Sequence, residues 1–98
     1  MKRVYKYKLA FVDLPTLVLP KGAEILTINE QNGSVQGNIN NEPYFMVWAL
    51  VDPDVKLTKE RQFRITGTGH TILESNLHFI NTVFLDNINQ VYHIFEVK

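Results

Sequence analysis

The chain lacks cysteine altogether, and its longest strongly apolar run covers only Phe45 to Val51. Without cysteine it can form neither disulfide bridges nor cysteine-ligated metal centres. The apolar run is far shorter than the roughly 20 residues of a membrane-spanning helix. The N-terminal segment begins with basic residues but reaches Asp13 without an uninterrupted apolar core, which argues against a signal peptide. We therefore expect a soluble intracellular protein that makes no membrane contact.

An excess of charge of either sign is also missing, because ten Lys and Arg residues balance ten Asp and Glu residues. This balance removes the main sequence argument for general nucleic-acid binding, which needs a basic surface. Hydrophobic residues make up 45% of the chain and charged residues 20%, which are ordinary values for a globular protein. With 98 residues and no break in composition, we predict a single domain over residues 1–98.

Sustained helical periodicity is absent as well, whereas alternation of apolar and polar residues is frequent. From Arg3 to Phe11 the odd-numbered residues after Arg3 are apolar or aromatic. This alternation is the period of a strand with one solvated face. Further extended segments are expected at 16–19, 23–29, 45–51, 61–65, 77–85 and 91–97, separated by Pro, Gly, Asn and Asp. We predict an all-β fold, a six- or seven-stranded antiparallel barrel or sandwich with little or no helix, apart from a single turn at 73–76.

Three of these strands are apolar on both faces. They are the segments 45–51, 77–85 and 91–97. One sheet packed on another covers only one face of each strand, so the second face needs another partner. A second copy of the same chain provides that partner symmetrically. The pattern therefore predicts a homo-oligomer.

Recognised catalytic motifs and metal-binding motifs do not occur in the sequence. The three histidines, His70, His78 and His93, do not have the local spacing of zinc ligands, which favours ordinary packed or exposed histidines over a metal site. Asp52 and Asp54 flank Pro53, where carboxylates commonly stabilise a turn. We expect no catalytic residue, no metal and no cofactor, and hence a protein that is not an enzyme.

The segment from Arg61 to Thr71, R-Q-F-R-I-T-G-T-G-H-T, has the strongest potential for ligand binding. Two glycines one residue apart let a backbone approach a ligand closely, and hydroxyl, imidazole and guanidinium groups bind phosphate or ribose. The alternative is that the glycines only let the strand bulge and turn. Under the binding hypothesis, arginine would neutralise a phosphate and an aromatic ring would stack on a base. The candidate ligand-binding residues are Trp48, Arg61, Phe63, Arg64, Gly67, Thr68, Gly69 and His70.

Five segments resemble a family of small uncharacterised bacteriophage and prophage proteins. These are VYKYKLAFVD, LPKGAEILTINEQNG, VWALVDP, RQFRITGTGH, and TVF followed by VYHIFE. The resemblance covers most of the chain, and VWALVDP followed by RxFxxxGTGH is its most specific part. The chain departs from the pattern by a longer segment between Gly33 and Val47 and by three extra residues at 57–59.

The resemblance implies no activity of its own, but it implies a phage setting in the host cytoplasm. By analogy with other small phage proteins, we expect a counter-defence protein whose oligomer sequesters a nucleotide-derived immune signal. One alternative is an inhibitor that docks on a host protein through a sheet edge or through the polar loop at 34–43. Another is a structural or assembly component of the virion. A nucleotide-cleaving enzyme would need a base or a metal cluster, which the sequence does not reveal.

Overall fold

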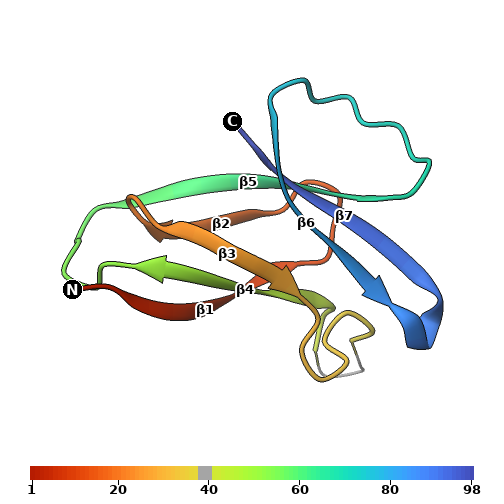
Figure 1. Ribbon diagram of the computed structural model, residues 1–98, viewed down its shortest axis with the longest axis horizontal. Helices are drawn as coiled ribbons and strands as arrows, with labels where there is room; N and C mark the ends of the chain where they lie inside the picture. Colours follow the sequence, from red (N-terminus) through yellow and green to blue (C-terminus); the bar gives the residue numbers. More distant parts are fainter. Residues whose placement is uncertain (38–40) are drawn as a thin grey trace.

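The computed structural model describes residues 1–37 and 41–98, which form two antiparallel sheets (Figure 1). The three-stranded sheet has the order β1 (Arg3–Ala10), β4 (Tyr44–Val51) and β3 (Glu24–Asn29). The four-stranded sheet has the order β2 (Thr16–Pro20), β5 (Thr58–Gly67), β7 (Gln90–Val97) and β6 (Leu77–Leu85). The prediction of a small all-β sandwich is confirmed, with seven strands in the described part of the chain.

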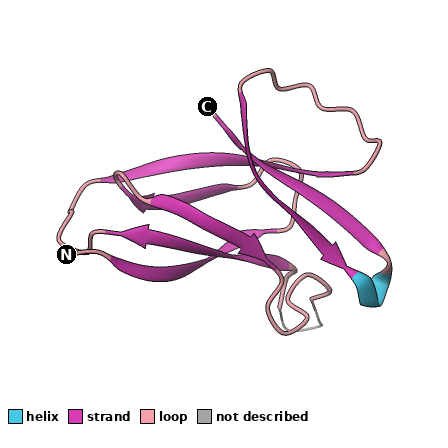
Figure 2. Ribbon diagram, viewed as in Figure 1, coloured by secondary structure: helices cyan, strands magenta, loops and turns pink. Residues whose placement is uncertain are grey.

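Helix is limited, in the described residues, to one short 3-10 turn between β6 and β7 (Figure 2). This turn, η1 (Asp86–Ile88), connects the antiparallel strands β6 and β7. The predicted turn of helix at 73–76 was wrong, because that segment is an irregular loop. No helix in the part of the chain that the structure describes is long and apolar enough to cross a membrane.

The centre of the three-stranded sheet is β4, the strand predicted to be apolar on both faces. Its inward side chains are Phe45, Val47, Ala49 and Val51, each at most 1% exposed. Phe45 and Val47 pack in one cluster with Phe63, Ile65, Val83 and Ile94 of the second sheet, and Ala49 and Val51 pack in another with Leu19 of β2. The core thus lies between the sheets, as the alternating pattern requires.

The outward face of β4 is covered to a large extent within the single chain. Met46 is only 5% exposed, and Trp48 and Leu50 are half-buried. The outward face of the β6–β7 hairpin is different, since Phe79 is 53% exposed and Phe84 is 66% exposed. Of the strands predicted to need a partner, the terminal hairpin therefore leaves the larger apolar surface open.

Asn81 joins the free edges of the two sheets. It follows an irregularity in the β6 register between Phe79 and Asn81. Its side-chain Oδ1 accepts a hydrogen bond from the Ile28 amide at 3.0 Å, and its Nδ2 donates to the Ile28 carbonyl at 2.7 Å. One side-chain amide thus pairs with both backbone groups of a β3 residue, as a neighbouring strand would.

A tight turn follows β3 at residues 31–34. The Ser34 amide donates to the Gln31 carbonyl at 3.1 Å, and Asn32 and Gly33 have φ values of 53° and 75°. Asn and Gly adopt such positive φ values most readily. The predicted polar loop at 34–43 is buried at its start, where Ser34 is 8% exposed and Val35 is 3% exposed. Residues 38–40 of that loop lie outside the described residues.

Candidate functional site

Residues 67–70 form a tight turn at the end of β5. The His70 amide donates to the Gly67 carbonyl at 3.3 Å, and Gly69 has a φ of 85°. A positive φ at the third residue of such a turn favours glycine. The His70 ring lies against Gly67, where an added Cβ would be 3.1 Å from its Cε1 atom. The glycines therefore do shape a turn, and the same turn borders a groove.

This groove has a volume of about 390 Å³ and lies between the turn and the beginning of β7. Its lining residues are Gly67, Thr68, His70, Asn89, Gln90, Val91 and Tyr92. Three of the predicted ligand-binding residues, Gly67, Thr68 and His70, thus come together with two side-chain amides and a tyrosine. We call this feature the turn groove. The turn groove is open to solvent and is not an enclosed cavity.

A chain of three polar side chains leads from the turn groove across the outer face of the four-stranded sheet. Thr68 Oγ1 lies 2.8 Å from Nε2 of His93, and Thr82 Oγ1 lies 3.0 Å from Nδ1 of the same ring. The strand register explains the arrangement, because His93 on β7 lies opposite Thr82 on β6 and opposite Thr66 on β5. Thr68 is solvent-exposed, whereas His93 and Thr82 are half-buried.

Arg64 lies on the same outer face, paired with Glu74 of the loop between β5 and β6. Arg64 Nε donates to Glu74 Oε1 at 2.6 Å, and its Nη2 contacts Glu74 Oε2. The hydrogen bond from Arg64 lowers the pKa of Glu74, and Glu74 in turn raises the pKa of Arg64. Arg64 is four residues before Thr68, roughly 13 Å along a strand. It does not line the turn groove.

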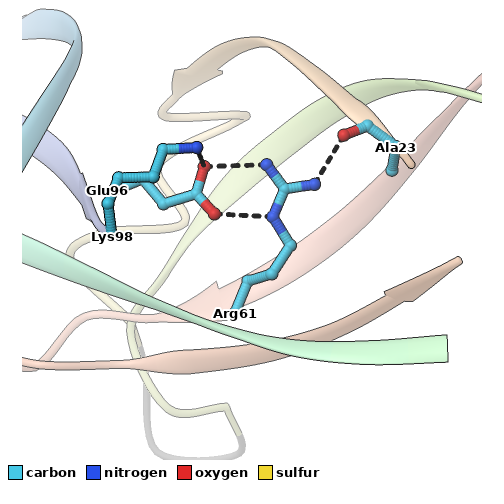
Figure 3. A network of polar contacts seen from close by, with 4 residues as sticks. All are labelled: Ala23, Arg61, Glu96 and Lys98. Atoms are coloured by element: carbon cyan, nitrogen blue, oxygen red, sulfur yellow. Dashed lines mark hydrogen bonds and ion pairs between the residues drawn. The ribbon is translucent and has the colours of Figure 1, made fainter. Parts of the chain in front are cut away.

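Arg61 takes part in a different network at the inner face, where β5 and β7 approach the beginning of β3 (Figure 3). Its Nε donates to Glu96 Oε2 at 2.6 Å, its Nη2 donates to Glu96 Oε1 at 2.7 Å, and its Nη1 donates to the Ala23 carbonyl. Lys98 Nζ lies 3.5 Å from Glu96 Oε1. The side chains of Arg61 and Glu96 are 13% and 7% exposed.

The charge of Glu96 is maintained in this buried position by its partners. Burial raises the pKa of Glu96, but the hydrogen bonds and positive charge of Arg61, together with Lys98, outweigh burial and bring that pKa below its usual range. Arg61 thus neutralises a carboxylate of its own chain and ties β5 to β7 and to the entry of β3. In this position it joins the two sheets.

The two aromatic candidates lie far from the turn groove in the fold. Phe63 is fully buried in the core, so its ring faces have no access to a ligand. Trp48 is on the outward face of the three-stranded sheet, opposite Lys6 of β1, whereas Thr68 is on the outward face of the other sheet. A single chain therefore cannot bring Trp48 and the turn together on one ligand.

Five residues of the site were not among the predicted residues. His93 contacts Thr68, and Thr82 contacts the other side of the His93 ring. The other three line the groove: Asn89, Gln90 and Tyr92. His93 is separated from Thr68 by 25 residues, so local spacing could not reveal the contact.

The fold and the site define a small antiparallel β-sandwich with a polar groove at the end of one sheet. The chain belongs to the family described as Domain of unknown function (DUF7352), which matches residues 1–98. No curated protein and no solved structure matches the chain significantly.

Proposed function

We propose that the protein is a phage-encoded binding protein that sequesters a nucleotide-derived host immune signal in the turn groove. The observation that carries the proposal is the meeting of Gly67, Thr68 and His70 with Asn89 and Gln90 around one groove of about 390 Å³. The phage setting and the host-cytoplasm location rest on the family resemblance alone. Sequestration requires binding groups but no catalytic step.

The groove offers groups suited to two parts of a nucleotide. The Asn89 amide can pair with the edge of a base, as such side chains do with adenine. Gln90 can add a donor through Nε2, because its Oε1 accepts a hydrogen bond from the Tyr92 hydroxyl at 2.8 Å. The Thr68 hydroxyl, the His70 imidazole and the backbone of the turn can hold a phosphate. This assignment replaces Arg61 and Phe63, which the fold uses internally, with groups that line the groove.

A second copy of the chain would enclose the ligand in this proposal. Phe84 on β6 lies opposite Val91 on β7, and Val91 lines the turn groove. Phe84 is 66% exposed, so an apolar contact made there would border the groove. A pocket between two subunits would bury more of a ligand than an open groove does.

Binding is tested by isothermal titration of the purified protein with cyclic nucleotides and ADP-ribose derivatives. With the ligand that binds, Thr68→Val and His70→Ala should each weaken the affinity roughly 10- to 100-fold, the effect of one lost hydrogen bond to a charged group. His78→Ala and Arg64→Ala change residues outside the groove and should leave the affinity near that of the unaltered protein. Absence of heat with every compound would contradict the proposal.

A second candidate function is inhibition of a host protein by direct docking. It is favoured by the exposed Phe79 and Phe84 on the outward face of the edge strand β6.

A virion component is a third possible function. No feature of the fold favours it, and such a protein would be found in purified particles.

Phe84→Ser distinguishes these uses of the surface. We expect the variant to lose self-association in light scattering if the surface pairs two copies, and to lose a stoichiometric host partner in pull-down if the surface docks on that partner. Val18→Ser is the matched control, because Val18 is 56% exposed on β2, at the opposite edge of the same sheet. Equal behaviour of both variants would show that the Phe84 surface has neither role.

A further inference from the structure

We propose that Thr68 is a nucleophilic hydroxyl activated by His93, and that it accepts acyl groups from small uncharged carboxylic esters. The proposal goes beyond ligand binding, because it assigns a covalent step to the turn groove. It stands on the contacts of Thr68, His93 and Thr82 and on the free amide of Gly69.

The three side chains have the arrangement of a nucleophile, a base and a group that orients the base. Thr68 Oγ1 is 2.8 Å from His93 Nε2, within hydrogen-bond reach for transfer of its proton. Thr82 Oγ1 is 3.0 Å from Nδ1 on the other side of the ring. When Nδ1–H donates to Thr82, the Nε2 lone pair faces Thr68 and can accept its proton.

The strands hold His93 more firmly than they hold Thr68. His93 lies on β7, between β5 and β6, with Thr66 and Thr82 opposite it on the two neighbouring strands. Thr68 is exposed in the turn, at the edge of the groove. A fixed base beside an accessible hydroxyl is what nucleophilic catalysis requires.

The residue after Thr68 supplies a donor for the oxyanion of a tetrahedral intermediate. The Gly69 amide makes no hydrogen bond within the described ranges of the chain. An added Cβ at Gly69 would meet nothing within 4 Å, so the space beside this residue is open to a substrate. In hydrolases with a nucleophile on a sharp turn, the amide of the following residue commonly takes this role.

The lining of the groove favours acyl transfer over phosphoryl transfer. None of its seven residues is Lys, Arg, Asp or Glu. Phosphoryl transfer needs cations to neutralise the charge on the phosphoryl oxygens. A carboxylic ester carries no charge, and its single oxyanion can be stabilised by backbone amides.

The reaction has two steps. Thr68 Oγ attacks the ester carbonyl carbon, and its proton passes to His93 Nε2. The bond between that carbon and the alkoxy oxygen then breaks as the alkoxy oxygen takes the proton from His93, and the alcohol departs. Water then attacks the acyl-threonine with His93 again as the base, which releases the carboxylic acid and restores the hydroxyl. No redox partner and no further reactant is needed.

Two probes test this without any knowledge of a natural substrate. p-Nitrophenyl acetate should release nitrophenolate, and a fluorophosphonate reagent should add one phosphonyl group to Thr68 with loss of fluoride, visible by intact mass and peptide mapping. Thr68→Val should abolish both signals, whereas Thr68→Ser should retain them. His93→Gln should slow acylation roughly 100-fold or more, in line with the usual contribution of a general base.

Matched controls and a pH profile separate this role from a structural one. Thr71→Val and His78→Gln, which change residues outside the relay, should react like the unaltered protein. The pH dependence of the acylation rate should be lost in His93→Gln, because that variant lacks the general base. On the same outer face Arg64 is paired with Glu74 and Glu60 lies opposite Val18, and His70 lies in the groove. The pH dependence is therefore measured again in His70→Ala, where its form should be kept whatever the rate.

Each other outcome contradicts the proposal. Label on a residue other than Thr68, or nitrophenolate release that Thr68→Val leaves unchanged, would overturn it. A pH dependence of the acylation rate that disappears in His70→Ala but persists in His93→Gln would also overturn the proposal. Because the probes contain no nucleotide, these results do not depend on whether a nucleotide binds.

Discussion

Asn81→Leu is expected to lower the free energy of unfolding by roughly 2–6 kcal/mol, because it leaves the Ile28 amide and carbonyl without their partner, at about 1–3 kcal/mol each. Small domains have only about 5–15 kcal/mol of stability in total. Ile28 itself is fully buried, so its backbone groups cannot readily turn to water. The loss should appear in urea unfolding and as a fall of about 10 °C or more in Tm.

Two further variants identify the hydrogen bonds as the cause. Asn87→Leu makes the same chemical change in the exposed 3-10 turn η1 and should cost far less. Asn81→Asp keeps an acceptor for the Ile28 amide but removes the donor to the Ile28 carbonyl. Asn81→Asp should therefore keep slow hydrogen exchange at the Ile28 amide while its free energy of unfolding falls. An unfolding midpoint for Asn81→Leu equal to that of the unaltered protein would show that the bridge does not hold the sheets together.

Strand positions could be predicted because this sequence alternates clearly. In the predicted strand at 61–65 a period of two places Arg61, Phe63 and Ile65 on one face, and the structure shows Phe63 and Ile65 in the core. That alternation already implied that Arg61 also points inward and that Arg64 points outward. The sequence therefore argued against both arginines serving one phosphate, although it could not name Glu96 and Glu74 as their partners.

The contacts that build the site depend on strand order, which alternation does not determine. Thr68 reaches His93 only because β5 and β7 are neighbours in the register that sets Gly67 opposite Tyr92. Asn81 reaches Ile28 because β6 of one sheet approaches β3 of the other. Such pairings join residues 25 and 53 positions apart, and the sequence contains no local signal for them.

Breaking the Arg61–Glu96 ion pair is expected to cost about 3–5 kcal/mol, because a buried charge loses its counter-ion. Arg61→Met and Glu96→Leu should each show this loss in urea unfolding. In the double variant the free energy of unfolding should fall by less than the sum of the two single losses, since no unpaired charge is buried. Part of the loss remains, because the Ala23 carbonyl still loses its donor. Arg64→Met is the matched control, with its pair on the outer face of the sheet.

The pH dependence of stability provides an independent test of this ion pair. The pKa of Glu96 lies below its usual range in the folded protein, so its stabilisation is present above the unfolded pKa of about 4.3. It is lost as the pH falls through the folded pKa, when the carboxylate is protonated in both states. The double variant should therefore lose less stability than the unaltered protein on acidification below about pH 4. Equal acid sensitivity would contradict a structural role and return Arg61 to the set of residues available to a ligand.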